Sequence, residues 1–231
     1  MSISDNIMSV KNNIRSACIR AGREPEDVKL VAVSKTMGTD KIMEAVNSGI
    51  RVFGENKVQE LVSKYEALDK GLEWHMIGHL QSNKVKYIID KVAMIHSVDS
   101  IKLLQEIDRR CKAYDKCIDV LIEINIGREA TKYGICPEDL GAFLEEAPKY
   151  ENVRICGLMT VAPKVNVPED ARPYFKEMKR LFEDAKSSNN VNVEMKYLSM
   201  GMTGDYEVAI EEGSNIVRIG TGIFGPRDYR F

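Results

Sequence analysis

Short apolar segments alternate along the whole chain with longer segments that mix apolar and charged residues. There are eight apolar segments, and most are continuously apolar rather than strictly alternating. Continuous apolar runs are typical of parallel strands that are covered on both faces. We therefore predict strands at VKLVAVSK (28–35), IRVFGEN (50–56), LEWHMIG (72–78), AMIHSVD (93–99), DVLIEINI (119–126), VRICGLMTVA (153–162), MKYLSMGM (195–202) and IVRIGTGIFG (216–225).

The segments between these strands have the length and composition of helices. They cover residues 39–48, 57–70, 80–91, 100–115, 137–149, 168–189 and 204–213. A further helix is predicted at the N-terminus, where apolar residues recur at spacings of three and four: Ile3, Ile7, Val10, Ile14 and Cys18.

Eight strand–helix alternations in 231 residues predict an α/β protein with a single (β/α)8 TIM barrel and an extra N-terminal helix. One domain is expected over residues 1–231, because no linker, repeat or low-complexity segment divides the chain. A doubly wound open sheet is the alternative. Such a sheet usually has fewer strands and a glycine-rich first turn, and this chain shows neither.

Composition narrows the classes of function. The net charge is −2, so the chain has no basic excess to bind nucleic acid or an anionic membrane. No apolar run approaches the roughly 20 residues of a transmembrane helix, and the N-terminus lacks the apolar core of a signal peptide. The five cysteines are scattered without a CxxC pair, which fits reduced thiols. We expect a cytoplasmic protein.

Candidate chemistry begins at Lys35, which ends the first predicted strand. Functional groups of a (β/α)8 barrel lie at the C-terminal ends of its strands. A lysine at a strand end can also snorkel, keeping its stem on apolar surface and its amine in water. Strand position alone leaves both interpretations open.

Two glycine-rich segments lie at the ends of the last two predicted strands, at SMGMTG (199–204) and RIGTGIFG (218–225). Barrels often bind phosphate in the loops after strands 7 and 8. Glycines let backbone N–H groups approach an anion closely, and Ser199, Thr203 and Thr221 can add hydroxyl donors. The alternative is that the glycines merely fit tight loops.

A phosphate site opposite an amine indicates a phosphorylated aldehyde held as an imine. Pyridoxal 5′-phosphate (PLP) carries both groups, and the neutral amine of Lys35 would form the Schiff base. Arg218 could face the pyridine nitrogen and, because arginine stays charged, keep that nitrogen unprotonated. A salt bridge inside the barrel mouth is the other interpretation of Arg218.

The sequence resembles the PLP homeostasis protein family, PLP-binding proteins built like the barrel domain of alanine racemase. The resemblance covers nearly the whole chain. Its motifs are VAVSKT (31–36), FGENKVQE (53–60), WHMIGHLQSNK (74–84), HSVDS (96–100), INIGREATKYG (124–134), GLMTVAP (157–163), LSMGMTGDYEVAI (198–210) and VRIGTGIFGPR (217–227).

The resemblance implies a PLP-binding protein of the alanine racemase N-terminal-domain type, involved in intracellular PLP (vitamin B6) homeostasis and supply. Its implied cofactor-binding residues are Lys35 as the Schiff-base lysine, Asn56 beside the cofactor, Ser199, Gly220 and Thr221 at the phosphate, and Arg218 at the pyridine nitrogen. Further residues implied to line or support the pocket are His75, His96 and Met159.

The resemblance is compatible with two classes of function, a PLP carrier and an amino-acid racemase. Racemisation usually needs two bases. In alanine racemases the second base is a tyrosine from a separate C-terminal β-domain across a dimer, and this chain ends at Phe231. Tyr133 and Tyr206 are weak local candidates. We expect a non-catalytic, monomeric carrier whose partners include PLP-dependent apoenzymes.

Metal binding is a weaker possibility, raised by the H-x3-H spacing of His75 and His79. The two histidines span a predicted strand end and the following loop. No third ligand is evident, so we expect no metal site.

Overall fold

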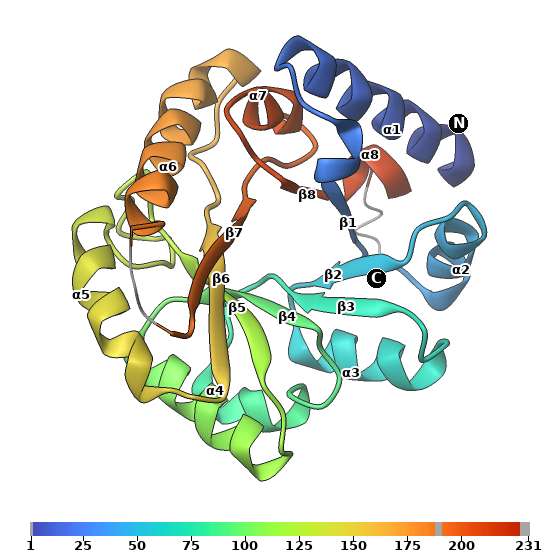
Figure 1. The fold of residues 1–231 in the computed structure, drawn as a ribbon. Helices are drawn as coiled ribbons and strands as arrows, with labels where there is room; N and C mark the ends of the chain where they lie inside the picture. Colours follow the sequence, from blue (N-terminus) through green and yellow to red (C-terminus); the bar gives the residue numbers. More distant parts are fainter. Residues whose placement is uncertain (1, 188–190, 227–231) are drawn as a thin grey trace.

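A computed structural model describes residues 2–187 and 191–226. Eight parallel strands close into a barrel in sequential order, so the predicted (β/α)8 architecture is confirmed (Figure 1). The strands are β1 (Lys29–Val33), β2 (Val52–Glu55), β3 (Glu73–Met76), β4 (Met94–Val98), β5 (Ile118–Glu123), β6 (Val153–Met159), β7 (Val193–Ser199) and β8 (Ile216–Ile219). The end of the predicted helix 168–189, the end of the predicted domain 1–231 and Arg227 of the last motif lie outside the described residues.

Helices form the outer ring around the strands (Figure 1). The α-helices are α1 (Ile3–Arg20), α2 (Thr39–Asn47), α3 (Val58–Ala67), α4 (Ile101–Ala113), α5 (Leu140–Glu146), α6 (Arg172–Ala185), α7 (Tyr206–Glu211) and α8 (Thr221–Phe224). The 3-10 helices are η1 (Pro25–Asp27), η2 (Ser82–Tyr87), η3 (Pro137–Asp139), η4 (Ala147–Lys149) and η5 (Pro168–Ala171). No described helix has both the length and the apolar character needed to cross a bilayer.

Two apolar clusters hold this arrangement together. The larger one lies between the barrel and the helices, and it includes the helix-facing side chains of all eight strands. The smaller one fills the barrel interior and consists of Val31, Met94, Leu121, Cys156, Met159 and Ile216. The interior is therefore a packed core, as expected for a barrel of this size, and a ligand must bind at one of its ends.

The predicted N-terminal helix is confirmed as α1, which lies beside α8 and α7 on the outside of the barrel (Figure 1). Ser2 and Asp5 form a capping box at its start. Two amides of α1 reach the C-terminal part of the chain: Asn6 donates to the carbonyl of Ile223 at 2.9 Å, and Asn13 donates to the hydroxyl of Tyr206 at 3.1 Å. Helix α1 thus supports the two helices that follow the glycine-rich loops.

Two predicted elements differ most from the observed ones. The segment 80–91 forms only η2, because its amides bond back three residues, as in Lys84 to Gln81, instead of continuing an α-helix. The predicted last strand, 216–225, ends at Ile219. At Gly220 the chain turns into α8, whose Ile223 and Phe224 amides both bond the Gly220 carbonyl.

Candidate functional site

A cavity of about 290 Å³ opens at the C-terminal end of the barrel. It has an apolar wall and a wall rich in small and hydroxyl residues. Its lining residues are Val33, Lys35, Asn56, Ile77, Val161, Met202, Thr203, Gly204, Arg218, Gly220 and Thr221. Five of the six predicted cofactor-binding residues, all but Ser199, therefore meet at one cavity, although they come from three widely separated parts of the sequence.

Lys35 lies on a tight turn just beyond β1, half-buried at the cavity. The next residue, Thr36, has a φ of 66°, a left-handed conformation that is uncommon and costly for a β-branched residue. Its N–H donates to Glu60 Oε2 of α3 at 2.7 Å. The carbonyl of Ser34, on the other side of Lys35, accepts from Lys64 Nζ at 2.8 Å. Helix α3 therefore fixes both peptide units that flank Lys35.

A buried ion pair between α3 and β2 stabilises the contacts that α3 makes with this turn. Lys64 Nζ lies 2.6 Å from Glu55 Oε1, and the two side chains are 8% and 0% exposed. The Ser34 hydroxyl donates to the same carboxylate oxygen at 2.6 Å. Burial raises the pKa of Glu55, and Lys64 opposes that rise. We name the four side chains Ser34, Glu55, Glu60 and Lys64 the lysine clamp, because together they hold the turn that presents Lys35.

Arg218 forms part of the cavity floor and is 3% exposed. Its guanidinium donates to Ser199 Oγ at 2.6 Å and to the Thr160 carbonyl at 2.8 Å. Burial lowers the pKa of Arg218 to about 10, so it stays protonated near neutral pH. No salt bridge to Arg218 occurs within 2–187 and 191–226, which argues against the alternative that it serves an ion pair in the barrel mouth. A buried cation thus faces the cavity through its remaining N–H groups.

Ser199, which the resemblance places at the phosphate, does not line the cavity. Its side chain is fully buried at the end of β7, behind Arg218, and bonds both Arg218 and His96. The hydroxyl of this loop that lines the cavity belongs to Thr203, which also accepts from the Gly222 N–H at 3.2 Å. Sequence position alone cannot distinguish these two hydroxyls, because the strand ends between them.

Asn56 lines the cavity next to β2. Its Oδ1 is buried and has no hydrogen-bond partner among the described residues. Gly78 fixes this position, because a Cβ at Gly78 would lie 2.5 Å from the Asn56 carbonyl oxygen. A buried polar atom without a partner at the edge of a cavity is the type of group that a polar ligand satisfies.

The three histidines occupy different environments. His75 and His96 lie inside the barrel and bond one another, so they support the cavity from below rather than line it. Met159 also lies in the barrel interior. His79 lies on the rim, where it bonds Asp99 at 3.0 Å and stacks on Tyr133 with ring centroids 3.7 Å apart.

Glu123 is a buried carboxyl group that interacts electrostatically with Arg218 and that sequence analysis did not identify. It ends β5, is 7% exposed and leaves Oε2 without a partner among the described residues. Burial raises its pKa to about 7, and Asp99 adds to the rise. The only sequence signal for it is an acidic residue inside the apolar segment DVLIEINI.

We predict that Glu123 makes stability depend on pH. The folded state holds the Glu123 proton up to about pH 7, whereas the unfolded chain releases it near the ordinary glutamate value of about 4.3. The free energy of unfolding should therefore fall on the order of 2 kcal/mol between pH 5 and pH 8 from this group. Glu123→Gln should remove that part of the slope in urea unfolding, and exposed Glu145→Gln should keep it. An unchanged slope in Glu123→Gln would contradict the prediction.

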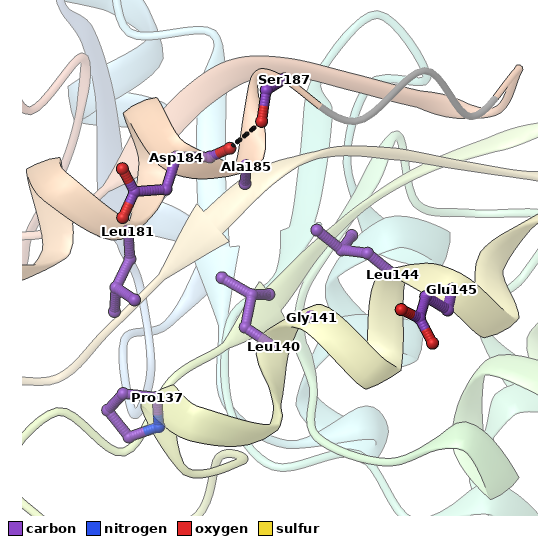
Figure 2. A pocket seen from close by; sticks show the side chains of 9 residues that line it. All are labelled: Pro137, Leu140, Gly141, Leu144, Glu145, Leu181, Asp184, Ala185 and Ser187. Atoms are coloured by element: carbon purple, nitrogen blue, oxygen red, sulfur yellow. Dashed lines mark hydrogen bonds between the residues drawn. The ribbon is translucent and has the colours of Figure 1, made fainter.

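A second hollow lies on the outside of the molecule, between α5 and α6 (Figure 2). Leu140 and Leu144 of α5 form one side, and Leu181 of α6 forms the other. Its charged lining residues are Glu145 and Asp184, both acidic. An anionic ligand would be repelled there, so the cavity at Lys35 is the candidate ligand site.

Comparisons with known proteins identify the family of this chain. A family described as alanine racemase, N-terminal domain, matches residues 6–228. The pyridoxal phosphate homeostasis protein of Aquifex aeolicus is 47% identical over 230 residues, which cover 99% of this chain and 100% of that protein. The protein of the same name from Pseudomonas aeruginosa is 40% identical over 228 residues, covering 98% and 96%.

A solved structure gives the most direct comparison. PipY of Synechococcus elongatus, solved with PLP bound, has a TM-score of 0.83 and 31% identity to this chain. The match covers 97% of this chain and 100% of that one. The barrel described here is thus similar, over its whole extent, to a barrel that binds PLP.

Proposed function

Because the chain belongs to the family of pyridoxal phosphate homeostasis proteins, whose barrel is that of the alanine racemase N-terminal domain, we propose that it binds PLP through Lys35 and serves intracellular PLP homeostasis. The observation that carries the proposal is the cavity itself. Its lining contains both Lys35, whose flanking peptide units the lysine clamp fixes, and Arg218, a buried cation without a salt bridge among the described residues.

The residues present fit this cofactor. Backbone and hydroxyl groups of Thr203, Gly220 and Thr221 supply donors for a phosphate. The apolar wall formed by Val33, Ile77 and Val161 suits the face of an aromatic ring. We assign the phosphate-side hydroxyls to Thr203 and Thr221, and we assign Ser199 to the support of Arg218.

Arg218 defines the chemistry that this site favours. When bound, PLP supplies an aldehyde for imine formation and a ring that withdraws electrons if its nitrogen is protonated. The charged guanidinium of Arg218 disfavours that protonation. The chain's residues therefore hold the cofactor firmly while weakening its use as an electron sink.

The carrier function is favoured over amino-acid racemisation by the composition of the cavity wall. Racemisation usually needs a base on each face of the substrate carbon. Among the described residues that line the cavity, Lys35 is the only base. Tyr206 instead bonds Asn13 of α1, and Tyr133 stacks on His79 at the rim. Neither tyrosine lines the cavity.

Transfer of PLP to an apoenzyme tests the proposal. The protein loaded with PLP and freed of excess cofactor is mixed with the apo form of a PLP-dependent aminotransferase, and aminotransferase activity is followed with time. We expect activity to return, while L-alanine incubated with the loaded protein keeps its configuration. Rapid racemisation of alanine without transfer would instead establish the enzyme. We also propose that the carrier is a cytoplasmic monomer, which analytical ultracentrifugation of the loaded protein can check.

A further inference from the structure

A chain of hydrogen bonds runs through the barrel from the cavity floor to the opposite end. Arg218 Nη1 donates to Ser199 Oγ at 2.6 Å, and Ser199 Oγ lies 3.0 Å from His96 Nδ1. His96 Nε2 lies 2.9 Å from His75 Nδ1, and His75 Nε2 lies 2.7 Å from Glu73 Oε1. Five side chains from four strands thus form one continuous series.

The series connects two different environments. Ser199, His75 and His96 have no exposed surface. Glu73 is the first residue of β3, at the N-terminal end of the barrel, and its side chain is 38% exposed. It also accepts from Lys29 Nζ, at the start of β1, over 2.9 Å. The cation at the cavity is therefore linked, through buried groups only, to a carboxylate at the far end of the barrel.

The direction of every hydrogen bond follows from the Glu73 end. Hydrogen bonding to His75 lowers the pKa of Glu73 to about 2, so Glu73 is an acceptor and His75 Nε2 must carry a hydrogen. Burial lowers the pKa of both His75 and His96, so each ring is neutral and has one acceptor nitrogen.

His75 Nδ1 consequently accepts from His96 Nε2–H, and His96 Nδ1 accepts from the Ser199 hydroxyl. The Ser199 oxygen then has its lone pairs available for Arg218. This agrees with the other end of the series, because a guanidinium can only donate. Both ends of the series require the same direction of hydrogen bonding, and no hydrogen bond in the series pairs two donors.

We propose that His96 and His75 are positioning residues for Arg218: through Ser199 they orient the guanidinium toward the cavity and link its charge to the carboxylate of Glu73. Arg218 has no salt bridge in the described part of the chain, and polarised hydrogen bonds connect it to the carboxylate of Glu73. The charged groups that face the series are Lys29 of β1, Glu73 of β3, Asp119 and Glu123 of β5, Asp205 before α7 and Arg218 itself. The functional part of this inference rests on the proposed binding of PLP.

The tautomers of the histidines test the direction of the series without any cofactor. The sequence contains three histidines, so ring ¹⁵N NMR spectra can be assigned with His79→Ala, which removes the one outside the series. We expect His75 and His96 to be neutral and protonated at Nε2 at pH 7.5, above the ordinary imidazole pKa of about 6.5, because burial lowers the pKa of both rings. Protonation of either ring at Nδ1, alone or together with Nε2, would overturn the proposal.

A double-mutant cycle tests the link to the cofactor. Ser199→Ala should weaken PLP binding about tenfold, and Glu73→Gln should weaken it by a smaller factor. In the Ser199→Ala protein, Glu73→Gln should have no further effect, because the series is already interrupted. His79→Ala, at the rim, should leave PLP affinity unchanged.

The outcomes separate this inference from the proposed function. If the unaltered protein does not bind PLP, the proposed function fails, and the tautomers alone still decide the direction of the series. If PLP binds but the effects of Ser199→Ala and Glu73→Gln add independently, the link from Glu73 to Arg218 is wrong while the proposed function stands.

Discussion

Replacement of Lys35 by alanine is expected to abolish covalent attachment of PLP. The unaltered protein incubated with PLP should show the visible absorption band of an imine, and borohydride should bleach the band and fix the cofactor to Lys35. Lys35→Ala should show only the spectrum of free PLP, because Lys35 is the only amine among the described residues that line the cavity. Mass spectrometry of the reduced protein would locate the added mass.

Lys132→Ala provides the matched control for this experiment. Lys132 is a half-buried rim lysine outside the cavity lining at Lys35, and its Nζ donates to the Ala162 carbonyl at 3.2 Å. We expect this variant to keep the imine band. Should Lys35→Ala retain the band with unchanged intensity, the assignment of Lys35 would be wrong, and so would the role given to the lysine clamp.

Breaking the lysine clamp is expected to have the second large effect. Lys64→Met removes the cation from Glu55, whose carboxylate is fully buried and already leaves Oε2 without a partner among the described residues. Removal of one member of a buried ion pair typically destabilises a protein by about 3–5 kcal/mol, because the other charge stays buried. Urea unfolding should show a loss of that size. Exposed Lys41→Met on α2 should show almost none.

A second substitution distinguishes the effect of the lost ion pair on stability from the effect of the altered turn on PLP attachment. Glu55→Gln combined with Lys64→Met removes the buried charge, so part of the lost stability should return. The Ser34 carbonyl would still lack its donor, so PLP attachment at Lys35 should remain weak in the double variant. Full recovery of both stability and attachment would show that the clamp does not position Lys35.

The barrel could be predicted from sequence because each of its strands is a local pattern. Continuous apolar runs such as VKLVAV mark strands covered on both faces, and these patterns need no knowledge of distant residues. Predictions failed where backbone hydrogen bonding decides the structure. The segment 80–91 contains Val85 and Ile88 at a helical spacing, yet its amides form 3-10 bonds.

The candidate site was predictable only in part for a related reason. Lys35 follows β1 and Arg218 lies near the end of β8, so their place at the barrel mouth follows from the fold alone. The partners of these residues come from other strands and helices, and nothing in the spacing of Glu55 and Lys64 or of His75 and His96 shows that they meet. The depth of Ser199 likewise depends on where β7 ends, which a sequence pattern locates only to within a few residues.

The pairing of β1 with β8 has a consequence for the biosynthesis of the protein. Lys35 follows the first strand and Arg218 lies on the last, and the two meet only when β8 docks beside β1 and α1 closes over α8. During translation, Lys35 therefore emerges from the ribosome long before the residues that complete its cavity have been synthesised. Under the proposed function, PLP bound between Lys35 and Arg218 would stabilise only the closed barrel by mass action, so the supply of PLP would influence how much of the newly made chain completes folding.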